Sequence, residues 1–331
     1  MKKSVWRVLY LLVFLLSFGL GIALTAISGG EFGGFRKVDW NESVGSIETD
    51  IAYGSGPLHK FDLYLPANRD RATKLVVYVH AGGFTGGDKA DDANIAKFLA
   101  SKGYVAATIN YSLSGNGNGN GNGNGNGNGN NANVRTMADD VKQGVASIVQ
   151  AAKSRGYPVD AMAIGGGSAG GALAMIYAYR EAEHAPVPVN AVISLVGPAA
   201  FDPMAWFGID DDFASDETAT SGAAFVSIMT GEPVSAEMMR SGTYRNVLKS
   251  ITPTALVTPA APPTLVAFGA LDKVAPFAAS TGLLQALERQ GVPHDALVFP
   301  NSGHGLNRDP KMSKVLGTKI DEYLDRYLPL D

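Results

Sequence analysis

The sequence contains no cysteine among its 331 residues. That absence excludes disulfide bridges, zinc sites built from thiolates, a cysteine nucleophile and the lipid-carrying cysteine of a bacterial lipoprotein. Charged side chains are sparse, at 18%, and a formal net charge of -4 gives no attraction for nucleic acid or anionic lipid. Because there is also no basic cluster beyond the extreme N-terminus, we exclude nucleic acid as a partner.

The N-terminal segment has the features of an export or anchoring signal. Three basic residues, Lys2, Lys3 and Arg7, precede an uncharged apolar run over residues 8–27. A run of about twenty apolar residues can span a bilayer as a helix, whereas a cleaved signal peptide has a shorter apolar centre. We therefore interpret residues 1–28 as a signal peptide or a membrane anchor. Both place the rest of the chain outside the cytoplasm, in a periplasmic or other extracytoplasmic space, because the basic residues stay inside.

From residue 42 to residue 331, strand-like and helix-like segments alternate, after a predicted linker over residues 29–41. The predicted strands cover residues 47–53, 59–65, 74–80, 104–110, 161–165, 191–196, 264–268 and 296–299. The predicted helices cover residues 94–102, 134–155, 168–183, 275–290 and 311–327. This alternation predicts one α/β domain with a mostly parallel, eight-stranded sheet and helices on both faces. Continuously apolar segments such as LVVYV are typical of strands buried on both faces.

Two segments interrupt this alternation. Residues 115–130 alternate glycine with asparagine, carry no apolar side chain and are predicted to form a disordered loop. The tract follows a predicted strand and so leaves the carboxyl edge of the sheet, where ligands bind in open α/β folds. Residues 197–261 are far longer than one crossover helix requires and are rich in methionine and aromatic side chains. We interpret them as a small cap that covers the site, the sheet edge or both.

The segment AMAIGGGSAGGALAMIYAYR contains the pattern G-x-S-x-G, formed by Gly166, Ser168 and Gly170. An apolar strand precedes the serine and a helix-forming run follows it, which is the context of a nucleophile elbow. The flanking glycines let strand and helix approach closely, and the helix N-terminus favours negative charge developing near the hydroxyl. We therefore expect Ser168 to be a nucleophile; the alternative is a glycine-rich turn that carries a serine by chance.

A serine hydroxyl needs a base within hydrogen-bond reach, and that base needs a third group to orient it. We expect the base to be His304, because the segment NSGHGL follows a strand and its glycines free a loop over the sheet edge. We expect the acid to be Asp272, which follows the strand TLVAF, although an aspartate there also suits a helix N-cap. The rival acid, Asp295, enters a strand rather than leaving one. Three other histidines are expected to be structural: His59, His184 and His294.

A second glycine-rich segment, VVYVHAGGFTGGDK, leaves another predicted strand at His80. Its glycines allow the backbone N–H groups of Gly82 and Gly83 to face a reacting oxygen. Together with the amide of Ala169, the residue after the candidate nucleophile, they would form an oxyanion hole. The alternative is a plain glycine-rich turn.

Four motifs follow one another along the chain: FDLYLP, HAGGF with GDK, GGGSAGG, and PPTLVAFGALDKVAP with SGHG. On these motifs the chain, from around residue 51 to its C-terminus, resembles the α/β-hydrolase serine esterases related to hormone-sensitive lipase and to bacterial feruloyl and acetyl-xylan esterases (BD-FAE-like). Ala81 departs from that family, standing where its H-G-G-G motif has the first glycine, and the glycine-asparagine tract replaces a short loop. The resemblance implies the α/β-hydrolase fold, a triad of Ser168, Asp272 and His304, and oxyanion donors Gly82, Gly83 and Ala169.

These features predict a carboxylesterase that works by two-step acyl transfer, with no metal and no organic cofactor. The expected substrate is a short-chain, aryl or carbohydrate ester, free or linked to a polymer. Two alternatives stay open. One is an exported serine peptidase of the prolyl-oligopeptidase type, although the chain has no room for that family's propeller domain. The other is a catalytically silent hydrolase fold that serves as a binding module.

Overall fold

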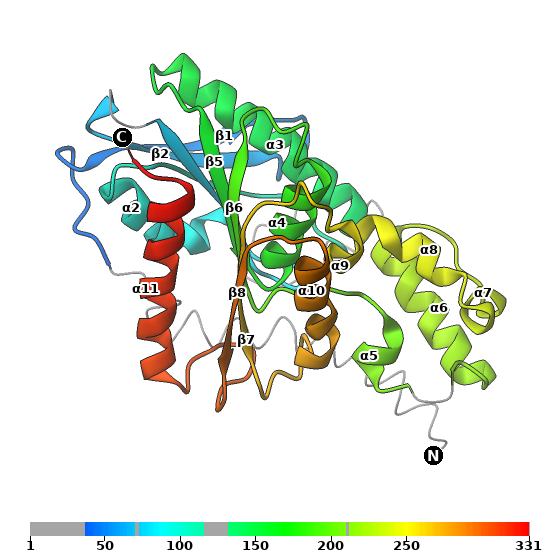
Figure 1. The fold of residues 1–331 in the computed structure, drawn as a ribbon. Helices are drawn as coiled ribbons and strands as arrows, with labels where there is room; N and C mark the ends of the chain where they lie inside the picture. Colours follow the sequence, from blue (N-terminus) through cyan, green and yellow to red (C-terminus); the bar gives the residue numbers. More distant parts are fainter. Residues whose placement is uncertain (1–36, 70–72, 116–131, 210–211, 331) are drawn as a thin grey trace.

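The computed structural model describes residues 37–69, 73–115, 132–209 and 212–330, which form a sheet between two layers of helices (Figure 1). The predicted signal or anchor and nearly all of the glycine-asparagine tract lie outside these residues. Within the described ranges, no helix is both long enough and apolar enough to cross a membrane.

The sheet has eight strands in the order β1-β2-β4-β3-β5-β6-β7-β8. Strand β2 pairs antiparallel with β1 and with β4, whereas the other neighbouring strands are parallel. The prediction of a mostly parallel, eight-stranded sheet is therefore confirmed. The strands are β1 (Gly45–Ala52), β2 (Lys60–Pro66), β3 (Lys74–Val79), β4 (Val105–Ile109), β5 (Ala161–Gly167), β6 (Val189–Leu195), β7 (Thr264–Gly269) and β8 (His294–Phe299).

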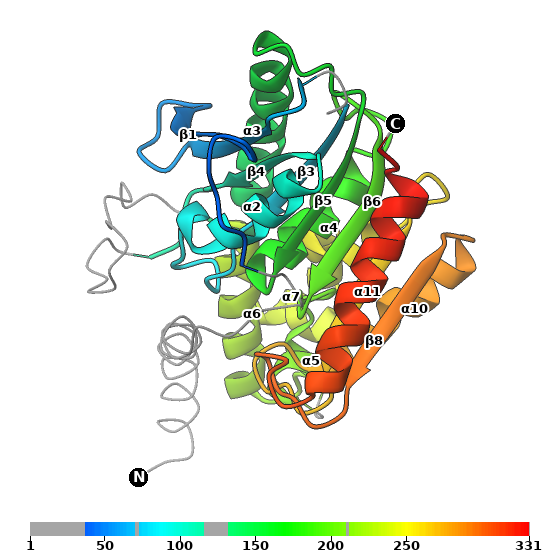
Figure 2. The ribbon, with the colours of Figure 1, turned by 90° about the vertical axis from the view of Figure 1, so that its left-hand side faces the viewer.

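Helices cover both faces of the sheet, as predicted. One face carries α2 (Ala93–Ser101) and α11 (Pro310–Tyr327), which lie in front of the sheet in Figure 2. The other face carries α3 (Val134–Ser154), α4 (Ala169–Arg180) and α10 (Phe277–Arg289). Each face encloses its own hydrophobic core.

The pleat of the central strand β3 explains its continuous apolar run. Leu75, Val77 and Val79 belong to the core beneath α3, α4 and α10, whereas Val76 and Tyr78 belong to the core beneath α2 and α11. Successive side chains of a strand point to opposite faces. A strand covered on both faces therefore needs apolar side chains at every position.

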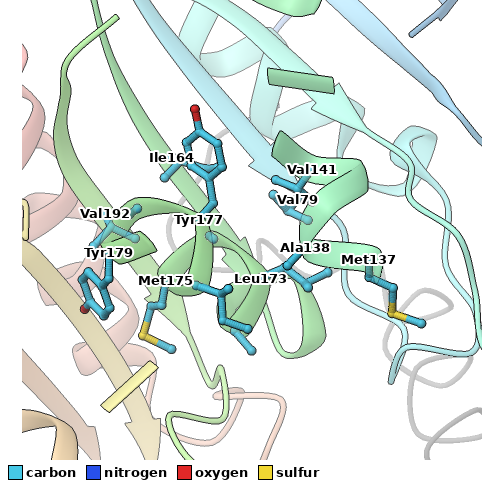
Figure 3. Close-up of a cluster of buried hydrophobic side chains, with 14 of the residues drawn as sticks. Val79, Met137, Ala138, Val141, Ile164, Leu173, Met175, Tyr177, Tyr179 and Val192 are labelled. Carbon is cyan, nitrogen blue, oxygen red and sulfur yellow. The ribbon is translucent and has the colours of Figure 1, made fainter. Parts of the chain in front are cut away.

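Helix α4 is buried along almost its whole length, because the sheet covers one side and α3 and neighbouring helices cover the other. Figure 3 shows Leu173 and Tyr177 of α4 in one cluster with Val79 and Ile164 of the sheet and Val141 of α3. The helix that follows Ser168 is therefore held by close packing on several sides, which gives the serine a rigid support.

Between β6 and β7 the chain forms a series of helices that were not predicted individually, one of 15 residues and the others of 6 or fewer. These are α5 (Pro203–Phe207), α6 (Asp216–Thr230), α7 (Ala236–Ser241), α8 (Tyr244–Leu248), a 3₁₀ turn η4 (Lys249–Ile251) and α9 (Pro253–Leu256). In α5, α6 and α7 a polar residue caps the N-terminus, as Ser215 does for α6 and Ser235 does for α7, and a glycine in the left-handed conformation ends the helix. Of these helices, α6 contacts α3 and α9 contacts α4 (Figure 1), and a role of the segment as a cap over the site stays a prediction.

A short 3₁₀ turn, η3 (Lys89–Asp92), brings a carboxyl group into the protein interior before α2. The Oδ2 atom of Asp92 is buried, and no residue in the described part of the chain offers it a hydrogen bond. Burial, with a smaller contribution from the nearby charge of Asp91, raises the pKa of Asp92 to about 8. Its carboxyl group is therefore mainly neutral at pH 7 in the folded protein.

The raised pKa of Asp92 predicts a pH-dependent stability. The unfolded chain has a carboxyl pKa near 4, so folding takes up a proton between about pH 4 and pH 8, and stability falls as the pH rises through that range. We expect Asp92→Asn to remove this dependence and to raise the free energy of unfolding at pH 8 by about 1 to 3 kcal/mol. Urea unfolding of parent and variant at pH 5 and pH 8 measures how the free energy of unfolding depends on pH. Asp325→Asn, at an exposed position, is the matched control. An equal pH slope in parent and Asp92→Asn would contradict the prediction.

Candidate functional site

The candidate residues lie on loops that leave the same edge of the sheet. Strands β3 and β5 pair in parallel with Val79 opposite Gly166, and β7 pairs with β8 with Gly269 opposite Phe299. The segments that follow these four strand ends therefore meet at the carboxyl edge. This edge is where open α/β sheets bind their ligands.

Ser168 occupies a sharp turn between β5 and α4. Its backbone has φ 51° and ψ -119°, a conformation that is strained for any residue with a Cβ atom. The turn is fixed from both sides, because the Ser168 amide donates to the Leu195 carbonyl at 2.8 Å and its carbonyl accepts from the Ala172 amide at 3.1 Å. Ser168 is the N-cap of α4 rather than its first residue, so the observed helix begins one residue later and ends three residues earlier than the predicted helix over residues 168–183.

The two flanking glycines allow this turn to pass close to the end of β3. A Cβ atom would lie 2.6 Å from the Val79 carbonyl oxygen at Gly166 and 2.0 Å from it at Gly170. Both distances are far shorter than a van der Waals contact. The G-x-S-x-G spacing is therefore required by the approach of β3, β5 and α4.

The structure brings the three residues predicted as a triad into one chain of hydrogen bonds. The Nε2 atom of His304 lies 2.8 Å from the Ser168 Oγ, and its Nδ1 atom lies 2.7 Å from Asp272 Oδ2. Because a carboxylate accepts hydrogen bonds, Nδ1 carries a proton and Nε2 is free to accept one from the serine hydroxyl. The side chains of Ser168 and Asp272 are almost completely buried, whereas His304 keeps 21% of its side chain exposed.

Asp272 performs two tasks with its two oxygen atoms. Oδ2 contacts His304, while Oδ1 accepts the backbone amides of Val274 and Ala275 at 2.8 and 3.0 Å. Asp272 therefore caps a turn of four residues, whereas the N-cap of the helix that follows is Pro276, so the alternative of a helix N-cap was wrong. That turn explains why α10 starts at Phe277 and not at residue 275 as predicted.

Asp295, the rival acid, is the second residue of β8 and lies at the amino edge of the sheet. Its Oδ1 atom is 4.0 Å from the Nζ atom of Lys319, and its side chain is 48% exposed. The structure therefore separates Asp295 from Ser168 and His304 by the length of a strand.

Two residues that support His304 were missed in the sequence. Asp309 accepts hydrogen bonds from the Asn301 amide, the Asn301 side chain and the Ser302 hydroxyl, at 2.6 to 3.0 Å. Burial alone would raise the pKa of this carboxyl group, but the bonds from Ser302 and Asn301 outweigh it and lower the pKa. Gly269 lets the loop approach β7, because a Cβ there would lie 2.2 Å from the Gly303 carbonyl oxygen. In the sequence, these two residues could have been found as the aspartate that precedes Pro310 and the glycine that ends the strand TLVAFG.

The residues predicted as oxyanion donors lie on two adjoining segments. Gly82 and Gly83 have positive φ angles of 138° and 61°, and Gly82 accepts the amides of Thr85 and Gly86 in a tight turn. Ala169 is the first residue of α4, and the first N–H groups of a helix have no partner within the helix. Gly82 and Gly83 therefore lie on a loop whose backbone conformations favour glycine, whereas Ala169 directly follows Ser168 at the start of α4.

His80, at the start of the loop over residues 80–84, is not aligned for proton transfer. Its buried ring stacks on Tyr111 at 4.3 Å between ring centroids, and its Nδ1 atom donates to the Ala81 carbonyl at 2.6 Å. Burial lowers the pKa of His80, so the ring is neutral. Its ring is thus held in place at the start of the loop by the stacking on Tyr111 and by the hydrogen bond to Ala81.

Chemically, the site combines a hydroxyl group, an imidazole that can accept its proton and a carboxylate that orients the imidazole. In the described part of the chain, no group of three or more histidine and acidic side chains is arranged to hold a metal ion. The strand order together with a serine at the β5–α4 turn defines the class of the protein as an α/β hydrolase.

The chain belongs to the BD-FAE family, which matches residues 61–287. Among curated relatives, a probable isoprenylcysteine alpha-carbonyl methylesterase of Oryza sativa subsp. japonica is 24% identical over 266 residues, covering 77% of this chain and 56% of that protein. This chain thus spans about half the length of the curated relatives that it matches over most of its own length.

Two solved structures share the fold. Esterase B from Lactobacillus rhamnosis, in an inhibited form, superposes with a TM-score of 0.64 at 18% identity, covering 94% of this chain and 96% of that one. A thermophilic esterase from Thermogutta terrifontis with propionate bound has a TM-score of 0.63 at 19% identity, covering 88% and 97%.

Proposed function

We propose that this protein is a serine carboxylic-ester hydrolase with Ser168 as nucleophile, His304 as general base and Asp272 as the orienting acid. The observation that carries the proposal is the hydrogen-bond chain from the Ser168 hydroxyl through His304 to Asp272. The strained backbone of Ser168 and the family membership support it independently.

The proposed reaction has two steps that use the same residues. His304 takes the hydroxyl proton as the Ser168 Oγ attacks the ester carbonyl, and then gives that proton to the departing alcohol. Water then attacks the acyl-enzyme with the same base and releases the acid. The amides of Gly82, Gly83 and Ala169 are the proposed donors to the oxyanion that forms in each step.

We propose that the substrate is a short-chain or aryl ester, including esters of carbohydrates. Aromatic rings follow one another from the loop over residues 80–84 towards the helices between β6 and β7. Phe84 lies 6.0 Å from Phe201 between ring centroids, and Phe201 lies 5.9 Å from Trp206. Phe84 and Phe201 are buried in the core, so the partly exposed ring of Trp206 at the end of this row is the one that offers an apolar surface to an acyl or aryl group. The propionate in the Thermogutta terrifontis esterase supports a short acyl chain.

A panel of esters with one amide tests the proposal. We expect hydrolysis of p-nitrophenyl acetate and butyrate, a lower kcat/KM as the acyl chain lengthens, and no cleavage of a proline anilide. Faster cleavage of the anilide than of any ester would favour the peptidase alternative. No turnover of any substrate, together with no labelling by a fluorophosphonate, would favour a silent binding module.

We further propose that the domain works outside the cytoplasm, because three basic residues precede the apolar run over residues 8–27. Whether that run is cleaved or retained as a tether, fractionation of cells that express the full chain should recover the esterase activity outside the cytoplasm. Activity confined to the cytoplasmic fraction would contradict this assignment.

A further inference from the structure

The loop over residues 80–84 and the turn at Ser168 meet at the carbonyl group of His80. A Cβ atom at Gly170 would lie 2.5 Å from that carbonyl oxygen, so the oxygen sits against the first turn of α4. The same oxygen accepts a hydrogen bond from the Tyr111 hydroxyl at 3.0 Å. Tyr111 therefore holds the His80 carbonyl, at which the loop that carries Gly82 and Gly83 meets the helix that begins with Ala169.

The chemistry of Tyr111 suits it to hold this point. Its side chain is completely buried, and its ring stacks on the His80 ring with only 10° between the two planes. Burial raises the pKa of Tyr111 far above its usual range. The hydroxyl group consequently keeps its proton and donates a hydrogen bond to the His80 carbonyl.

The segment that carries Tyr111 also holds the other end of the loop. The Ser114 amide donates to the Phe84 carbonyl at 2.7 Å, and Phe84 is itself buried with a positive φ of 65°. Gly82 and Gly83 thus lie between two fixed points, both supplied by the residues that follow β4. The Asp140 carboxylate, which accepts the Ser112 amide at 2.9 Å, ties this segment to α3.

We infer that Tyr111 is a positioning residue that sets the oxyanion donors of Gly82 and Gly83 relative to Ala169; the inference rests on the proposed function. Oxyanion donors act only when they lie within hydrogen-bond distance of the oxygen as it becomes charged. A small displacement of the loop therefore weakens binding of the transition state more than binding of the ester itself. Loss of the Tyr111 hydroxyl should lower kcat and leave KM almost unchanged.

The test compares two tyrosines that make the same kind of bond. Tyr157 is also buried, and its hydroxyl donates to the Pro66 carbonyl at 2.8 Å, far from Ser168. We expect Tyr111→Phe and Tyr157→Phe to lower Tm to a similar extent, since each loses one buried hydrogen bond. Only Tyr111→Phe should lower kcat for p-nitrophenyl acetate, by about tenfold to a hundredfold, with KM within about twofold.

The rate of labelling by a fluorophosphonate gives a second measurement, because its phosphoryl oxygen takes the place of the oxyanion. This rate should fall in Tyr111→Phe in parallel with kcat, while the acidic limb of the pH profile stays where the parent has it. If the parent hydrolyses esters but Tyr111→Phe and Tyr157→Phe have the same kcat, the inference about Tyr111 is wrong and the proposed function stands. A parent that hydrolyses no ester would overturn the proposed function and the inference with it.

Discussion

Ser168→Ala is expected to lower kcat for p-nitrophenyl acetate by about five to six orders of magnitude, because the attacking oxygen is removed and only binding and the oxyanion donors remain. The fold should persist, since the hydroxyl group is the only atom lost and the backbone of the turn is held by Leu195 and Ala172. Hydrolysis assays on the purified variant measure kcat, and circular dichroism measures whether the fold persists. Labelling by a fluorophosphonate that persists in the alanine variant would show that another residue is the nucleophile.

Ser168→Gly provides the matched control for this variant. It should be as inactive as alanine, yet glycine adopts the backbone angles of residue 168 without strain. We therefore expect the glycine variant to exceed the alanine variant in unfolding free energy by about 1 kcal/mol. The two variants then separate the loss of the hydroxyl group from the strain of the turn.

Asp272→Asn is expected to lower kcat by about four orders of magnitude. The amides of Val274 and Ala275 donate to one oxygen of residue 272, so the oxygen of an asparagine should face them and its NH₂ group should face His304. The imidazole would then accept at Nδ1 and carry its proton on Nε2, where it cannot receive the proton of Ser168. The pre-steady-state rate of acylation measures the effect.

Asp295→Asn is the control for the acid. Asp295 is half exposed and lies at the opposite edge of the sheet, 4.0 Å from Lys319. Its replacement should change kcat less than twofold, as surface substitutions away from a site generally do. A loss of activity in Asp295→Asn that equals or exceeds the loss in Asp272→Asn would mean that the acid is misassigned.

Much of the fold could be predicted from the sequence because its signals are local. The apolar run KLVVYV gave β3 to within one residue, and the eight predicted strands correspond to the eight observed. The candidate triad was also accessible, since each member follows a strand and parallel strands share their carboxyl edge. The structure brings these residues together, and their roles in the reaction stay predictions.

The remaining features depend on contacts between segments that are distant in the sequence. Nothing in NYSL indicates that the Tyr111 hydroxyl meets the His80 carbonyl, because 31 residues separate them. Between β6 and β7, α5, α7, α8 and α9 were missed because none exceeds 6 residues. The longer α6 was missed because its start is set by a cap at Ser215 rather than by a long apolar period. The pairing of β2 antiparallel to β4 likewise follows from topology and not from composition.

A selection for folded protein alone would affect Asp272 and Ser168 in opposite ways. Asp272 binds both His304 and the turn that follows it, whereas Ser168 has a strained backbone. At position 272 the side chain that orients His304 also fixes a turn, so variants chosen only for solubility or heat resistance would tend to keep it. At position 168 the same selection would favour glycine, which relieves the turn and removes the hydroxyl group. A library of this protein screened for folding alone would therefore lose its candidate nucleophile before its candidate acid.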